Sequence, residues 1–222
     1  MTDAAGRRPL RVKICGLTRL EDAVAAAAAG ADYLGFIASD GFPRSASAAL
    51  GAAFGRETEL PVVAVVVDEP TDRVVELAGA AGATVVQLHG DESPGELVAL
   101  RGRGPWKLWK ALRVRTGEDV AEGIRRYGPV ADGLLLDGWH PSMAGGSGTR
   151  FPWEVVGQVR GAFPPGLDFI AAGGLHPGDV AEAVERMGPD VVDVSSGVET
   201  SPGVKDPARI RSFIENAKCA RR

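Results

Sequence analysis

The sequence predicts an α/β fold, a single (β/α)₈ TIM barrel with eight parallel strands. Eight short β-branched apolar runs recur through the 222 residues, and each is followed by turn residues and a helix-like segment. Alternation of this kind is typical of a parallel sheet, and eight strands are the number that closes into a barrel. An open doubly wound sheet would need G-x-G-x-x-G after the first strand, where this chain has Cys15-Gly-Leu-Thr18. The chain is slightly short for a barrel, so tight loops are expected.

The first half of the chain begins with a strand expected at residues 11–15. Thr18, followed by Glu21, has the spacing of a capping box that starts an Ala-rich helix ending near Gly30. Further strands are expected at residues 33–37, 62–67 and 84–88, with a helix at about 71–81.

The second half continues the alternation. A fifth strand is expected at residues 106–112 despite its lysines, and the three leucines at 134–136 suit a sixth strand buried on both faces and ending at Asp137. Phe151-Pro-Trp-Glu is typical of a helix start. Two last strands at 167–171 and 191–194 precede a helix at about 206–217.

Composition indicates one globular domain, because 45% of residues are hydrophobic, 24% are charged, and no linker divides the chain. We expect a flexible N-terminal tail at residues 1–10 and a barrel domain at 11–222. The net charge of −4 and the scattered Lys and Arg residues argue against a nucleic-acid partner. No apolar run reaches the roughly 18 residues of a membrane span. The start has no secretory apolar core, so a cytoplasmic location is expected.

Reactive residues gather at the ends of the expected strands, where active sites of such barrels lie. They are Cys15, Arg44, Asp68, His89, Arg113, Asp137, the Gly173-Gly174 pair and the Ser196-Gly197 pair. With two cysteines, three histidines and no Cys/His cluster, no metal site is expected.

Cys15 has two interpretations. It is either a small buried apolar residue or, placed before a helix N-terminus, a partly ionised thiol. Lys13 shares its strand parity and points with it into the barrel. Its ammonium either lowers the pKa of the thiol or forms an ion pair inside the barrel, for example with Asp193.

Asp137 lies where the sixth strand leaves the core. We therefore favour Cys15 and Asp137 as a proton-transfer pair, since no motif around His89, His140 or His176 supports a nucleophilic triad. Arg44, just after a Pro, is either a solvated surface residue or a bidentate clamp for a carboxylate.

Three Gly-rich loops follow the last three strands. Each is singly explained as a tight turn, but their positions together indicate a site for a phosphorylated small molecule. The residues predicted to bind it are Gly146, Ser147, Gly148, Gly173, Gly174, Ser196 and Gly197.

These residues together resemble the phosphoribosylanthranilate isomerase family over nearly the whole chain. The motifs are Lys13-Ile-Cys-Gly-Leu-Thr18, Phe42-Pro-Arg44-Ser, Gln87-Leu-His-Gly-Asp91, Leu136-Asp137 with Gly145-Gly-Ser-Gly148 and Phe151-Pro-Trp153, Ala172-Gly-Gly-Leu175, and Val192-Asp-Val-Ser-Ser-Gly-Val-Glu199 with Pro202-Gly-Val-Lys205. The resemblance implies a cofactor-free Amadori rearrangement in tryptophan biosynthesis, with Cys15 as general base and Asp137 as general acid. It implies that Arg44 holds the anthranilate carboxylate, and His89 is counted with the substrate-binding residues.

Two loops depart from the family pattern, at residues 39–42 and 139–143, and both border the anthranilate end. The alternatives are the related sugar isomerase of histidine biosynthesis, a bifunctional isomerase that serves both pathways, and a non-catalytic barrel that binds phosphorylated ligands. Histidine-pathway relatives have Asp where this chain has Cys15, and pure binding needs neither Cys15 nor Asp137. A monomer and a homodimer are both compatible with the sequence.

Overall fold

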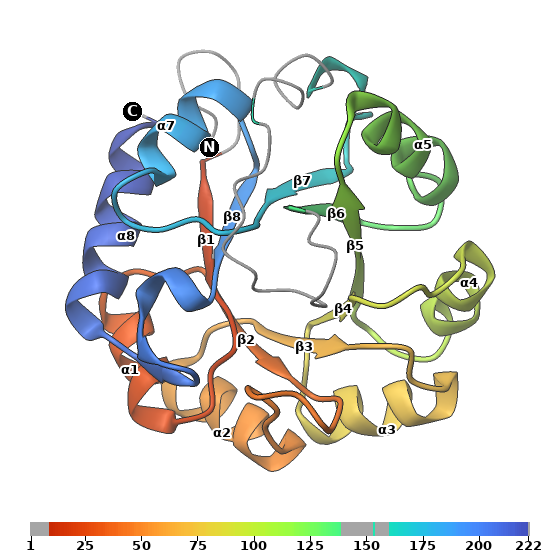
Figure 1. The fold of residues 1–222 in the computed structure, drawn as a ribbon. Coiled ribbons are helices and arrows are strands. Elements are labelled where there is room, and N and C mark those ends of the chain that lie inside the picture. Colours follow the sequence, from red (N-terminus) through yellow and green to blue (C-terminus); the bar gives the residue numbers. More distant parts are fainter. Residues whose placement is uncertain (1–8, 139–152, 154–159, 222) are drawn as a thin grey trace.

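The computed structural model describes residues 9–138, 153 and 160–221, and it contains a closed barrel of eight parallel strands. Each strand pairs with the next, and the last pairs with the first (Figure 1). The strands are β1 (Arg11–Ile14), β2 (Tyr33–Ile37), β3 (Val62–Val66), β4 (Val85–Leu88), β5 (Lys107–Val114), β6 (Gly133–Gly138), β7 (Asp168–Ala171) and β8 (Val191–Val194). The predicted fold class is therefore confirmed, with strand bounds within a few residues of those expected.

Helices surround the barrel on its outside (Figure 1). The α-helices in the described part are α1 (Leu20–Ala28), α2 (Ala48–Thr58), α3 (Thr71–Ala80), α4 (Pro94–Arg101), α5 (Gly117–Tyr127), α7 (Val180–Met187) and α8 (Pro207–Cys219). Two 3₁₀ turns, η1 (Arg160–Ala162) and η2 (Ser196–Val198), and a small antiparallel pair, β9 (Glu199–Ser201) with β10 (Val204–Lys205), complete the described elements. None of these helices is both long and apolar enough to cross a membrane.

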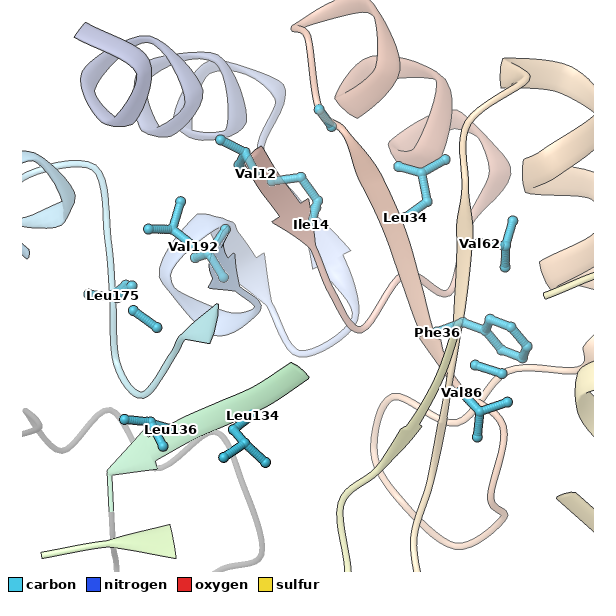
Figure 2. Packing of buried hydrophobic residues seen from close by; sticks show 14 of the residues in the cluster. Val12, Ile14, Leu34, Phe36, Val62, Val86, Leu134, Leu136, Leu175 and Val192 are labelled. Carbon is cyan, nitrogen blue, oxygen red and sulfur yellow. The ribbon is translucent and has the colours of Figure 1, made fainter. Parts of the chain in front are cut away.

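The alternation of side chains along each strand produces two apolar layers. One set faces outward and packs under the helices; Figure 2 shows part of it, including Leu34 and Phe36 of β2 and Val62 of β3. The other set fills the barrel interior, where Tyr33 and Trp109 pack edge to face with ring centroids 5.1 Å apart. Lys13 belongs by parity to this inner set and is fully buried.

The capping box expected at Thr18 and Glu21 is wrong. Helix α1 begins at Leu20 with Arg19 as its N-cap, and no side chain caps it. The Thr18 hydroxyl instead donates to the carbonyl of Gly203, 2.6 Å away, and so ties this loop to the β9–β10 hairpin. The spacing rule failed here because a tertiary partner competes for the hydroxyl.

The helix predicted from Phe151-Pro-Trp-Glu falls mostly outside the described residues. Trp153, the described residue of that segment, is helical and buried.

Candidate active site

A cavity of about 480 Å³ opens at the carboxyl ends of the strands. Its lining brings together most of the residues that the sequence singled out. Those that line it are Cys15 after β1, Arg44 after β2, His89 after β4, Asp137 on β6, Gly173 and Gly174 after β7, and Ser196 after β8. Because parallel strands end on one face of a barrel, chain segments far apart in sequence meet here.

Cys15 lies in this lining with only 8% of its surface exposed. Burial, the largest effect, raises the pKa of the thiol, and the nearby ammonium of Lys13 lowers it without reversing the net upward shift. The raised pKa favours the neutral thiol in the protein without substrate, rather than the partly ionised thiol considered from the sequence. Removal of the thiolate from water outweighs the attraction of one ammonium group.

Lys13 contacts three acceptors from the barrel interior. Its Nζ lies 3.0 Å from Cys15 Sγ, 2.9 Å from Gln87 Oε1 and 3.1 Å from Asp193 Oδ1. Burial alone would lower the pKa of Lys13, but Asp193 and Cys15 raise it and the net shift is upward. Both interpretations drawn from the sequence, contact with the thiol and an ion pair with Asp193, are thus realised by one ammonium group.

Asp137 has close neighbours in the loops that follow β4 and β7. Its Oδ2 lies 3.4 Å from Nε2 of His89. Gly173 has a φ of +87°, and a Cβ there would lie 2.9 Å from Asp137 Oδ1 and 2.5 Å from the backbone nitrogen of Gly138. A glycine at 173 is therefore needed both for the backbone conformation and for the approach to the carboxylate.

Arg44 is neither a solvated residue nor an empty clamp, because it already binds a carboxylate of the protein. Its Nε and Nη2 donate to Glu199 Oε1 and Oε2 at 2.8 and 2.7 Å. Lys205 Nζ donates to the same Glu199 Oε1 at 2.7 Å. Burial raises the pKa of Glu199, but these two cations outweigh it and the net shift is downward, which keeps the carboxylate ionised. The bidentate edge of Arg44 is thus occupied by Glu199.

The Gly-rich loops after β7 and β8 lie beside each other. Gly174 has a φ of +71°, and η2 begins at Ser196. Gly197 does not line the cavity; a Cβ on it would lie 2.0 Å from the carbonyl oxygen of Leu175, so it permits the two loops to pack closely. Gly146, Ser147 and Gly148, like His140, lie outside the described residues.

Two polar residues of the site were missed as functional residues. Gln87 and Glu199 both lie in quoted motifs, yet their partners come from other strands and loops. Strand parity could have found Gln87, since Val85 faces inward and Gln87 is two residues further along the same strand.

His176 pairs with Asp179, with Nε2 3.0 Å from Oδ2, and does not line the cavity. In the described residues, no group of three or more His, Cys, Asp or Glu is placed to hold a metal ion.

Comparison with known proteins agrees with this geometry. The sequence profile of the N-(5'phosphoribosyl)anthranilate (PRA) isomerase family matches residues 12–216. An N-(5'-phosphoribosyl)anthranilate isomerase from Myxococcus xanthus is 45% identical, over 94% of this chain and 96% of that protein.

Solved structures give the same result. Monomers of the dimeric phosphoribosylanthranilate isomerase from Thermotoga maritima superpose with a TM-score of 0.83 at 33% identity, covering 95% of this chain and 99% of that one. A phosphoribosylanthranilate isomerase in complex with reduced 1-(o-carboxyphenylamino)-1-deoxyribulose 5-phosphate gives 0.82 at 32% identity, with the same coverage. The chain belongs to the N-(5'-phosphoribosyl)anthranilate isomerase family.

Proposed function

We propose that Asp137 and Cys15 are the general acid and general base of the Amadori rearrangement catalysed by this family, which converts N-(5-phosphoribosyl)anthranilate to 1-(2-carboxyphenylamino)-1-deoxyribulose 5-phosphate. The observation that carries the proposal is that both side chains line the same cavity at the carboxyl ends of the strands. Acid and base on different strands can act on neighbouring atoms of one bound sugar.

The reaction needs one proton given and one taken. Asp137 protonates the furanose ring oxygen, the C1–O bond breaks, and the nitrogen lone pair forms the C1=N bond of a Schiff base. The thiolate of Cys15 then removes the proton from C2, and the electron pair moves to C1=C2 while the C=N electrons return to nitrogen. The resulting enolamine tautomerises to the ketone, with the proton lost from the C2 hydroxyl and one gained at C1. Oxidation at C2 balances reduction at C1, so this scheme requires no external oxidant.

Arg44 is proposed to hold the anthranilate carboxylate through Nη1, because Glu199 occupies its other edge. Apolar side chains of Ile37, Phe42 and Val65 line the same cavity and suit an aromatic ring. His89 lines the same cavity, with Nε2 3.4 Å from Asp137 Oδ2, and is kept among the proposed substrate-binding residues.

The phosphate is proposed to bind at the loops after β7 and β8. Gly173, Gly174, Ser196 and Gly197 would present backbone N–H groups there, which supply local positive potential in a chain with net charge −4. Gly146, Ser147 and Gly148 are proposed to close the same site. Phosphate binding energy would hold C1 and C2 against the acid and base.

Steady-state turnover tests the proposal. Cys15→Ser and Asp137→Asn are each expected to lower kcat by about 10²–10⁴-fold. Cys219→Ser is a matched control at an exposed thiol and should leave kcat unchanged. Wild-type activity in all three variants would overturn the assignment. Turnover of the histidine-pathway aldose would instead favour a bifunctional isomerase.

We further propose a cytoplasmic enzyme whose partner is its small phosphorylated substrate rather than nucleic acid, and which is a monomer or a homodimer. The Thermotoga maritima relative is described as dimeric. Light scattering coupled to size-exclusion chromatography would distinguish the two states, and a larger assembly would contradict the proposal.

A further inference from the structure

Three side chains connect the proposed base, Cys15, to the proposed acid, Asp137, at the barrel mouth. The connection runs from Cys15 through Lys13, Gln87 and His89 to Asp137, with successive separations of 3.0, 2.9, 2.8 and 3.4 Å. Every member comes from β1, β4 or β6, or directly follows one of these strands. The chemistry of each group fixes which atoms donate.

Lys13 fixes the direction of the Gln87 amide. An ammonium has three N–H donors and no acceptor, so the amide atom 2.9 Å from Nζ must be the oxygen. A flipped amide would place two donors against each other inside the barrel, where Lys13 is fully buried and Gln87 is 1% exposed. The Gln87 NH₂ group therefore points to His89.

Gln87 in turn fixes which nitrogen of the His89 ring carries the proton. Its Nε2 can only donate, and it lies 2.8 Å from Nδ1 of His89, so Nδ1 must accept. In the neutral ring the proton is then on Nε2, which is the nitrogen that faces Asp137 Oδ2.

We propose that Gln87, held by Lys13, is a positioning residue that locks His89 in the Nε2–H tautomer so that the ring donates to Asp137. This inference rests on the proposed role of Asp137 as general acid. As Asp137 gives up its proton, charge develops on its carboxylate, and the 3.4 Å contact can shorten into a hydrogen bond that stabilises it. The opposite tautomer would turn a ring lone pair toward that charge and oppose the step.

The lock is tested first without substrate. Long-range ¹H–¹⁵N correlation spectra of the histidine rings, at about pH 8 where an ordinary imidazole is neutral, report which nitrogen carries the proton. His89→Gln identifies the His89 signals by their loss. The expected result for wild type is a proton on Nε2 of His89. A proton on Nδ1, or averaging of the two tautomers, would overturn the proposal.

Variants at Gln87 connect the tautomer to catalysis. The carboxylate of Gln87→Glu can accept from both Lys13 and Nδ1–H, so the proton should move to Nδ1 and kcat should fall about tenfold or more, with KM within about twofold. Gln87→Met, of similar size, should give mixed tautomers and an intermediate kcat. A tautomer shift with unchanged kcat would overturn the link to Asp137.

Asp137→Asn in the same assay separates the two proposals. If that variant keeps wild-type kcat, the acid assignment fails, whereas the wild-type tautomer measurement stands without it.

Discussion

The thiol of Cys15 is subject to two opposing electrostatic effects. Burial disfavours the thiolate, and the Lys13 ammonium at 3.0 Å favours it. The net pKa is raised, so the neutral thiol dominates near pH 7 and the thiolate fraction grows as pH rises.

The pH dependence of Cys15 alkylation measures this balance. In a Cys219→Ser background, which removes the exposed thiol, the iodoacetamide rate should rise with pH to a midpoint above about 8.5, the value of an ordinary thiol. Lys13→Met should move the midpoint further up, because it removes the effect that lowers the pKa. A wild-type midpoint below the ordinary value would contradict the dominance of burial.

The sequence predicted those site residues whose location follows from the end of a single strand. Cys15, Asp137 and Gly173 follow directly from strand ends, because parallel strands deliver their carboxyl ends to one face. The pairing of Arg44 with Glu199, which is 155 positions away, depends on how two loops fold over the barrel mouth. Short-range patterns contain no information on such a contact.

At the scale of elements, helix starts also differ in whether the local sequence pattern predicts them correctly. Thr18 with Glu21 matched the capping-box spacing, but the box is absent there. Ser93 with Glu96 and Thr116 with Asp119 form complete capping boxes at α4 and α5. The strands were predictable where their apolar runs are continuous and buried on both faces, as in β3 and β6.

A pair of Ser/Thr substitutions distinguishes real from apparent capping. Ser93→Ala should lower the free energy of unfolding by about 1 kcal/mol, because the hydroxyl accepts from the backbone N–H of Glu96 and donates to Glu96 Oε2, and both contacts are lost. Thr18→Ala should leave the local stability of α1 unchanged and instead weaken the β9–β10 hairpin, seen as faster amide hydrogen exchange there. Faster exchange in the first turn of α1 would show that Thr18 caps the helix after all.

At the scale of the whole molecule, the barrel is closed by the pairing of β1 with β8, through four residue pairs from Arg11 with Val191 to Ile14 with Val194. Helix α8 covers this seam, since it packs against β1, α1 and α7. Its buried residues are Ile210, Phe213, Ile214 and Ala217, an i, i+3, i+4, i+7 stripe that faces the barrel. In the last turn of α8, Nζ of Lys218 donates to the carbonyl oxygen of Gly30 at 2.7 Å. Helix α8 therefore stabilises the contact between the first and the last strand of the barrel.

Phe213→Ala tests whether closure limits the stability of the whole barrel. The side chain is fully buried, so its loss should lower the free energy of unfolding in urea by about 3–5 kcal/mol. Val98→Ala, at a side chain 58% exposed on α4, is the control and should change it by less than about 0.5 kcal/mol. Phe213 does not line the cavity, so the folded fraction of the variant should keep the wild-type KM. If α8 only covered the barrel from outside, it would detach by itself in the Phe213→Ala variant. Fluorescence of the interior Trp109 in that variant would then give an unfolding midpoint close to that of the wild type. A common loss of helix signal and Trp109 signal at lower urea would show instead that the seam between β1 and β8 opens with the fold as a whole.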